Sequence, residues 1–99
     1  MRKVKKFFNR NRNKFEIIAE ILRKLRVPTG RTNIMLCCNM SSTQSGQYLN
    51  LMRSNDLIRI DGIAGKITYQ RTEAGREFLE VYNKMVLLLD PGISPPFVI

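Results

Sequence analysis

The chain has 99 residues, enough for one domain with a modest core, so a partner subunit would add stability. Its 17 Lys and Arg outnumber its 8 Asp and Glu, and the formal charge of +9 favours a polyanionic partner. Nucleic acid is the commonest such partner for a small chain, and an anionic membrane surface is the alternative. The absence of histidine excludes imidazole catalysis and histidine metal ligands.

Residues 1–12 are predicted to form a flexible basic arm. Residues 1–14 hold seven Lys and Arg and no acid, and like charges without a counter-charge do not pack. Such an arm can lie along phosphates or enter a minor groove. The alternative is a solvated tail, against which Phe7 and Phe8 argue. The cations expected at phosphates are Arg2, Lys3, Lys5, Lys6, Arg10 and Arg12.

The chain carries no pattern for membrane insertion or secretion. The basic N-terminus lacks the apolar segment of a signal peptide, and the apolar run 85–89 is too short to span a bilayer. We therefore expect a cytoplasmic, nucleoid-associated protein that does not bind membranes. Cys37 and Cys38 are adjacent, which suits neither a mutual disulfide nor a zinc site. One or both are expected to be reduced thiols packed as small hydrophobes, with a redox role for one exposed thiol as the alternative.

Two amphipathic helices are predicted after the arm. Asn13 is a candidate N-cap for the first helix, and Pro28 ends it. Its apolar positions recur at helical spacing: Phe15, Ile17, Ile18, Ile21, Leu22 and Leu25. Glu16 and Glu20 are expected to pair with Arg23 and Lys24 on the exposed face. The second helix is predicted over Arg31 to Cys38, with Asn39 in the left-handed conformation at its end.

The stretch from Met40 to Leu57 predicts the third helix of a helix-turn-helix. Ser41 and Gln44 have the spacing of a capping box, and Asn55-Asp56 ends the helix. Its apolar side chains form one stripe: Tyr48, Leu49 and Met52. The other faces are polar and suit base edges in a major groove: Ser42, Thr43, Gly46, Gln47, Asn50 and Arg53. The alternative is an ordinary surface helix, because polar outer faces are common. Gly46 costs about 1 kcal/mol against alanine, and it either admits a close approach of the DNA backbone or has no role.

A β-hairpin is predicted next. Residues 57–60 and 66–70 are rich in β-branched and apolar side chains, which favours two strands. Residues 61–65 contain Asp-Gly and a second Gly, as hairpin loops do. Three helices followed by a hairpin make a winged helix, whose wing would present Arg59, Lys66 and Arg71 to phosphates or a minor groove.

The last helix is predicted to run from a Thr72 cap to about Leu89. Its final turns are apolar almost all round, and one small domain cannot cover every side of such a helix. A homodimer is therefore expected, with this interface: Phe78, Tyr82, Met85, Leu88 and Leu89. Residues 91–99 contain three prolines and are predicted to form an extended tail.

The acidic residues form no catalytic pattern. They fall at capping or exposed positions, with no partnered base, no glycine-rich phosphate loop and no metal cluster. We expect no enzyme activity, no cofactor and no bound metal.

The order of these patterns resembles the archaeal ArnR-like winged-helix family over residues 15–89. The matching segments are EIIAEIL, TGRTNIM, MSSTQSGQYLNLM with a following LI, and Y-x-x-T-x-x-G-R-E-F-L from Tyr69. Small members of that family have long C-terminal helices that pair as an antiparallel coiled coil. The resemblance implies a homodimer that binds duplex DNA through the third helix and the wing. This chain departs from it because its third helix lacks the lysines common in relatives.

The sequence thus predicts an α+β, mainly helical protein. A winged helix-turn-helix would occupy residues 13–71 and a dimerisation helix residues 72–90. The expected function is homodimeric binding of double-stranded DNA, in transcription regulation or chromatin. The alternative is a protein-interaction module of the transcription machinery with incidental nucleic-acid affinity. Beyond the arm, the expected DNA contacts are Arg31, Ser42, Thr43, Gln44, Gln47, Arg53, Arg59, Lys66 and Arg71.

Overall fold

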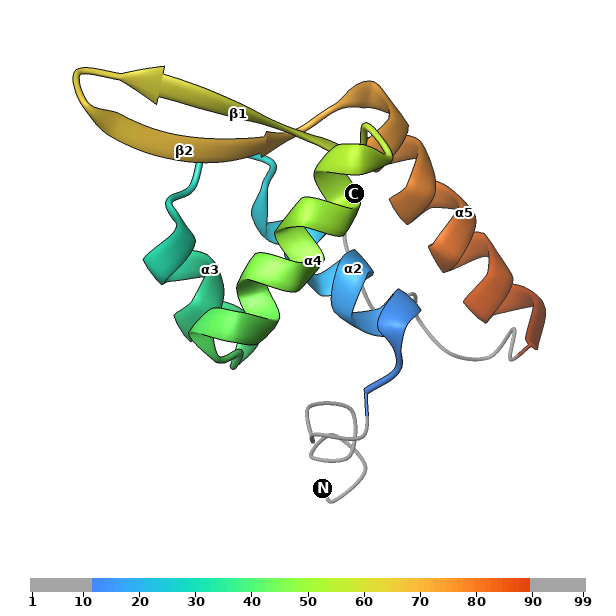
Figure 1. The fold of residues 1–99 in the computed structure, drawn as a ribbon. Helices are drawn as coiled ribbons and strands as arrows, with labels where there is room; N and C mark the ends of the chain where they lie inside the picture. The colour runs from blue at the N-terminus through green and yellow to red at the C-terminus, as the bar shows by residue number, and fades with distance from the viewer. Residues whose placement is uncertain (1–11, 90–99) are drawn as a thin grey trace.

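The computed structural model describes residues 12–89, which form four helices and one antiparallel hairpin (Figure 1). In chain order the elements are α2 (Lys14–Lys24), α3 (Arg31–Cys38), α4 (Ser42–Ser54), β1 (Ile58–Ile63), β2 (Lys66–Arg71) and α5 (Glu73–Leu89). This is the mainly helical winged helix-turn-helix that the sequence predicts. The predicted arm up to residue 11 and the tail 91–99 lie outside the described residues.

The first helix, α2, begins at the predicted cap. The Asn13 side chain accepts a hydrogen bond from the backbone N–H of Glu16 at 2.8 Å, and the Glu16 side chain accepts one from the Asn13 N–H at 2.9 Å. This capping box satisfies two N–H groups that the helix leaves free. Ile21 and Leu22 are buried, but Phe15, expected on the apolar face, is 55% exposed. It lies in the first turn, where residues 13–15 are all exposed.

The turn between α3 and α4 follows the prediction. Asn39 adopts the left-handed conformation with φ of 54°, and Met40 is buried directly before α4. The Ser41 hydroxyl accepts from the Gln44 N–H at 3.1 Å, which caps α4. The return bond from the Gln44 side chain, which would complete a capping box, is not among the hydrogen bonds of residues 12–89. Leu49 and Met52 then enter the core.

The hairpin has longer strands and a tighter turn than predicted. The expected loop at 61–65 is wrong, because β1 continues to Ile63 and Asp61 and Gly62 pair across the sheet with Thr68 and Ile67. Only two residues form the turn, Ala64 with φ of 54° and Gly65 with φ of 79°. Two positive φ values in a two-residue loop are the geometry of the turn that matches strand twist.

Ala64 is a poor residue for its position, because side chains other than Asn, Asp and Gly rarely adopt positive φ. We expect Ala64→Asn to raise the free energy of unfolding by about 0.5–1 kcal/mol. Urea denaturation followed by circular dichroism measures the change. Gly65→Ala should act in the opposite direction, and a lower midpoint for Ala64→Asn would contradict the assigned turn.

The base of the wing is tied to the loop between α2 and α3. Thr29 pairs with Tyr69 through two backbone hydrogen bonds of 3.0 and 2.8 Å, and the Arg71 N–H donates to the Leu25 carbonyl at 3.2 Å. The sequence did not predict this third pairing partner. It fixes the hairpin relative to the start of α3.

Helix α5 begins against the end of the helix-turn-helix. The Thr72 hydroxyl accepts from the Gly75 N–H at 3.1 Å, which confirms the predicted cap, and it donates to the Asp56 carbonyl at 2.5 Å. The Thr72 N–H donates to the Leu57 carbonyl at 3.0 Å. Leu79 is fully buried in the core, so α5 packs against α2 and closes the domain.

The two cysteines differ in environment. Cys37 is exposed and Cys38 is buried, and both are free thiols. Burial raises the pKa of Cys38 to about 11, with the nearby Glu20 carboxylate adding to the shift. A buried thiol of this kind stays protonated and packs as a small hydrophobe.

Candidate nucleic-acid interface

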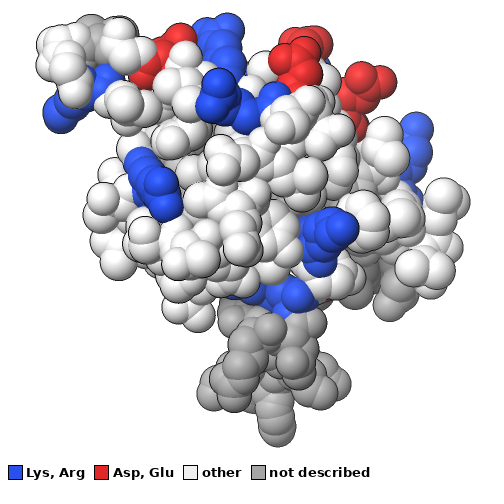
Figure 2. All heavy atoms as spheres, viewed as in Figure 1, with Lys and Arg blue, Asp and Glu red and all other residues white. Residues whose placement is uncertain are grey.

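One face of the domain carries polar and basic side chains without acidic ones. No aspartate or glutamate occurs between Glu20 and Asp56, the stretch that contains α3 and α4. In Figure 2 the charged residues over α3 and α4 are basic, and the acidic side chains gather along the upper edge, over the hairpin and the start of α5. An anionic ligand therefore meets no aspartate or glutamate on α3 or α4.

Helix α4 supplies the polar part of this face. Ser42, Thr43 and Gln47 are exposed, as is Arg53 in the last turn. Gln44 is half-buried, because it follows the cap that Ser41 forms. Asn50 is also exposed, three residues beyond Gln47, on the same helix. Its spacing from Ser42 and Gly46 already indicated this position in the sequence.

Arg31 reaches α4 from the first position of α3. Its Nη2 donates to the Ser42 carbonyl at 2.7 Å and lies 3.4 Å from the Ser42 hydroxyl oxygen. The guanidinium therefore lies against the first turns of α4. This places Arg31 together with Ser42 on one surface, as the predicted set of DNA contacts requires.

The wing contributes two exposed cations. The Arg59 guanidinium lies 3.1 Å from the Gln70 side-chain oxygen and 3.4 Å from an Asp61 carboxylate oxygen, both at hydrogen-bond distance. Exposed pairs of this kind contribute little to stability and exchange readily with other anions. Lys66, at the start of β2, is exposed and has no ion pair among residues 12–89.

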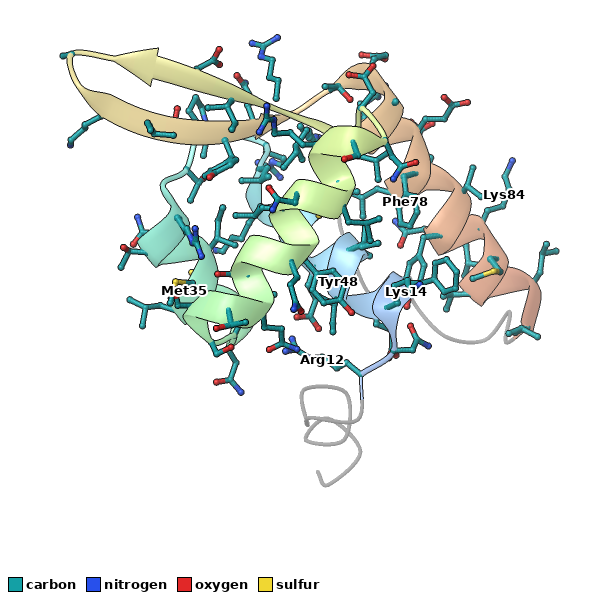
Figure 3. All side chains as sticks on the ribbon, viewed as in Figure 1. Arg12, Lys14, Met35, Tyr48, Phe78 and Lys84 are labelled. Atoms are coloured by element: carbon teal, nitrogen blue, oxygen red, sulfur yellow. The ribbon has the colours of Figure 1, made fainter. Side chains whose placement is uncertain are left out.

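Two further predicted phosphate contacts bond to other parts of the domain, Arg71 partly buried and Arg12 largely so. The Arg71 guanidinium lies 3.5 Å from the Leu22 carbonyl, and burial lowers its pKa, with Arg26 and Arg76 adding repulsion. Arg12 donates to the Glu20 carboxylate, and its side chain is only 7% exposed (Figure 3). Its other terminal nitrogen lies 3.4 Å from the Asn39 carbonyl. Glu20 thus pairs with Arg12, where the sequence predicted Lys24.

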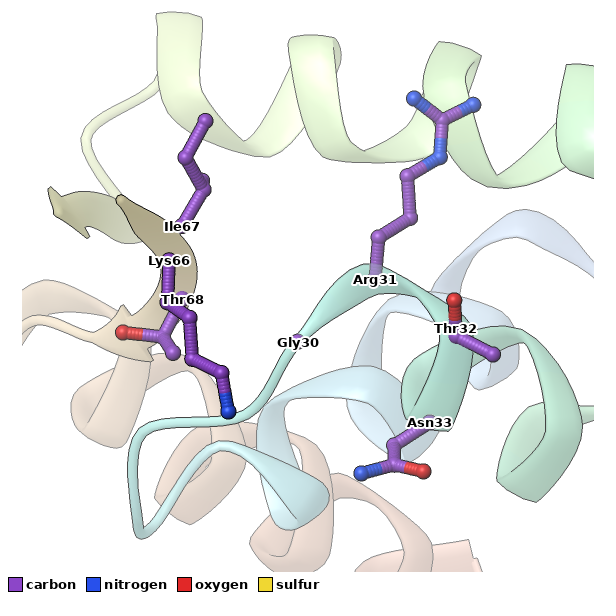
Figure 4. A pocket seen from close by; sticks show the side chains of 7 residues that line it. All are labelled: Gly30, Arg31, Thr32, Asn33, Lys66, Ile67 and Thr68. Atoms are coloured by element: carbon purple, nitrogen blue, oxygen red, sulfur yellow. The ribbon is translucent and has the colours of Figure 1, made fainter. Parts of the chain in front are cut away.

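An open groove separates the wing from the start of α3. It has a volume of about 340 Å³ and is lined by Gly30, Arg31, Thr32, Asn33, Lys66, Ile67 and Thr68 (Figure 4). Arg31 and Lys66 form its charged walls, and Thr32, Asn33 and Thr68 add polar groups. The backbone pairing of Thr29 with Tyr69 brings these two segments together. The groove therefore joins the basic surface of the wing to that of α3.

The residues predicted for the dimer interface divide between two faces of α5. Tyr82 is buried in the core, and Phe78 packs against it from the same side (Figure 3). Burial raises the pKa of the Tyr82 hydroxyl, and Glu16 and Glu20 on α2 add to the shift. Met85, Leu88 and Leu89 are exposed, at 47%, 79% and 84%. Val81, which the prediction did not include, is 61% exposed beside them.

Over residues 12–89, no helix is both long and apolar enough to cross a membrane. The same residues contain no group of three Cys, Asp or Glu side chains that could hold a metal ion.

The fold is shared with proteins of known structure. The chain is similar to Sso10a-2, a DNA-binding protein from Sulfolobus solfataricus, with a TM-score of 0.73, 19% identity, and coverage of 81% of this chain and 84% of that one. It is also similar to a predicted DNA-binding transcriptional regulator from E. coli (TM-score 0.58, 21% identity, 85% and 86% coverage). A third similar structure is the reduced form of the transcriptional regulator YodB from B. subtilis. Its TM-score is 0.63 at 18% identity, with coverage of 94% of this chain and 95% of that one.

At these identities the similar structures establish the fold alone. No curated protein sequence matches the chain significantly. The winged helix-turn-helix family matches residues 11–89, which include all the helices and strands described above. The chain belongs to the winged helix-turn-helix family.

Proposed function

We propose that the protein binds double-stranded DNA, as a transcription regulator or chromatin-associated factor, with α4 in the major groove and the wing beside it. The observation that carries this proposal is the face of α3 and α4, which is exposed, polar and free of acids. Short polar side chains on such a helix suit base edges. The three similar structures are described as DNA-binding proteins or transcriptional regulators, which supports the same function.

Affinity and base preference are assigned to different residues. Phosphates would be neutralised mainly by the N-terminal arm and the wing, through Arg2, Lys3, Lys5, Lys6, Arg10, Arg59 and Lys66. Thr43 and Gln47 on α4 would contact base edges. We assign Arg12 and Arg71 structural roles instead, because both are engaged within the fold.

If the arm and the wing bind phosphates while α4 contacts bases, substitutions in the two regions should change the salt dependence of binding differently. Each neutralised phosphate contributes about 0.9 to the slope of log affinity against log salt. Deleting residues 2–10 should therefore flatten the slope by up to about 4.5 units, since it removes five cations, and weaken binding to all duplexes alike. Gln47→Ala should leave the slope unchanged and reduce preference at one or two base pairs. Fluorescence anisotropy with labelled duplexes across a salt series measures both effects.

Two outcomes would contradict this assignment. An arm deletion that leaves affinity and slope intact would show that phosphates are held elsewhere. If no duplex binds even at low salt, the DNA-binding proposal is wrong. The second candidate would then take its place, a protein-interaction module that uses the exposed apolar side of α5.

We also propose that two copies pair through α5, as the resemblance to the ArnR-like family implies. The support is the exposed apolar surface formed by Val81, Met85, Leu88 and Leu89. Such a surface is unfavourable in water and is buried when two helices pack together.

Met85→Glu is expected to dissociate this dimer, because it would place an unpaired charge in an apolar interface. Met85→Leu is the matched control and should keep the dimer. Analytical ultracentrifugation at micromolar concentration distinguishes the two forms. A monomeric wild-type protein would contradict the proposal.

A further inference from the structure

The side chain of Arg31 occupies an unusual place for a residue of α3. It extends from the start of α3 across to α4 (Figure 4), where Nη2 donates to the Ser42 carbonyl at 2.7 Å. Arg31 is exposed, and it forms no ion pair among the residues that the structure describes. The guanidinium is therefore held by a neutral acceptor on α4, and its positive charge can interact with an anionic ligand.

Gly46 leaves the space that this guanidinium occupies. A Cβ atom at position 46 would lie 3.0 Å from Nη2 of Arg31, 3.7 Å from Cζ and 3.9 Å from Nη1. Gly46 lies inside α4 and has no positive φ, so its backbone does not require glycine. Glycine weakens a helix compared with alanine. The contact with Arg31 gives a physical reason for glycine at this position.

The guanidinium lies over the exposed face of α4. Ser42, Gly46 and Asn50 recur at intervals of four and lie along one face, with Thr43 and Gln47 next to them. The cation that α4 itself provides, Arg53, lies in its last turn. Arg31 therefore supplies a positive charge to the first half of a helix that has none there.

We propose that Arg31, placed on Gly46, is a specificity-determining residue that contacts a guanine in the major groove. This inference rests on the proposed binding of duplex DNA. Arginine carries five N–H donors, and the Ser42 carbonyl accepts from Nη2 alone. The remaining donors can bond both O6 and N7 of guanine, the commonest specific contact in the major groove. Among the described residues no carboxylate pairs with this guanidinium.

The first experiment compares base preference in wild type, Arg31→Ala and Arg31→Lys. A preferred duplex is selected from a random pool with the wild-type protein, and each base pair is then changed in competition assays. Both variants should lose preference for one G·C pair by about 5- to 150-fold, while preferences elsewhere stay unchanged. Arg31→Lys keeps the charge but lacks the two parallel donors. It should therefore keep the salt slope of the wild type.

The second experiment uses Gly46→Ala, which separates recognition from stability. The added Cβ meets the end of a flexible side chain, so Arg31 shifts and the helix still folds. The urea midpoint should rise, because alanine favours the helix, while preference for the same G·C pair falls. In the Arg31→Ala background, Gly46→Ala should cause no further loss of preference. Ser54→Ala, at the exposed end of α4, is the matched control and should leave preference unchanged.

Three results would overturn the inference. A uniform loss of affinity in Arg31→Ala, with a slope reduced by about one, would make Arg31 a phosphate contact. Gly46→Ala with full preference would show that Gly46 does not place Arg31 for recognition. Wild-type protein that binds duplexes while Arg31→Ala behaves identically would remove Arg31 from the interface and leave the proposed function standing. A wild-type protein that binds no duplex would overturn the proposed function itself.

Discussion

Gly75→Ala is expected to lower the free energy of unfolding by about 3 kcal/mol, because it forces an added atom into occupied space. A Cβ atom at position 75 would lie 2.2 Å from the Leu57 carbonyl oxygen and 2.9 Å from Cδ2 of Leu22. The nearest of these neighbours is backbone. The Leu57 carbonyl also accepts a hydrogen bond from the Thr72 N–H at 3.0 Å. It therefore cannot move away from the added Cβ atom without losing that hydrogen bond. Helix α5 must move outward from the core.

Urea denaturation followed by circular dichroism measures this loss. Gly62→Ala is the matched control, because a Cβ there comes no closer than 3.8 Å to the Lys66 carbonyl oxygen and the position is exposed. A Gly75→Ala protein that fails to fold agrees with the expectation. One that unfolds at the wild-type midpoint contradicts the close contact between α5 and Leu57.

Arg12→Leu is expected to lower the free energy of unfolding by about 2–3 kcal/mol at pH 7, because it leaves the Glu20 carboxylate without its partner. The two side chains are only 7% and 13% exposed, so solvent replaces the lost ion pair poorly. Arg12 also reaches the Asn39 carbonyl at 3.4 Å, so the substitution further loosens the turn before α4.

The loss should depend on pH. Burial raises the pKa of Glu20 from its ordinary value of 4.5, although Arg12 acts to lower it. Removing Arg12 lets the pKa rise further, so the folded variant binds a proton more strongly than the unfolded chain does. Protonation of Glu20 therefore stabilises the folded variant. This stabilisation is complete below the pKa of Glu20 in the unfolded chain and is lost as the pH rises through its pKa in the folded protein. The destabilisation by Arg12→Leu should therefore be smaller at pH 4 than at pH 7.

Denaturation at pH 4 and pH 7 tests this dependence. Lys14→Leu, at an exposed position of α2, the helix that carries Glu20, is the control and should change stability by less than about 0.5 kcal/mol at either pH. Adding Glu20→Gln to Arg12→Leu should recover part of the loss at pH 7, because it removes the buried charge. Equal losses at both pH values would show that the ion pair does not determine the stability at this position.

Features set by neighbouring residues were predictable from the sequence. The end of α2 follows from Pro28, and the end of α3 follows from Asn39, which adopts the left-handed conformation. The starts of α2, α4 and α5 follow from Asn13, Ser41 and Thr72, whose side chains cap the helices. Each cap bonds to backbone groups within a few residues of itself, so the residue type and its position are enough to predict it.

Features set by contacts between distant residues were not predictable. Arg12 counted as one more cation of the arm, because its partner Glu20 lies on α2 and Asn39 lies 27 residues away. The sequence left Gly46 with two interpretations, a close approach of the DNA backbone or no role, and could not show that the Arg31 side chain lies against it. In α5 the apolar side chains surround the helix. Periodicity therefore could not show that Tyr82 enters the core while Met85 stays exposed.

The junction at Thr72 also determines how the domain would be spaced along DNA. The Thr72 hydroxyl and N–H bond the Asp56 and Leu57 carbonyls, directly after α4 ends, so no flexible linker separates α4 from α5. In a dimer paired through α5, the distance between the two α4 helices would be fixed by the protein alone. Two half-sites would then have to lie on the same side of the duplex, about one helical turn or a multiple apart. One inserted base pair rotates a half-site by about 35°, so such a protein would tolerate little variation in operator length.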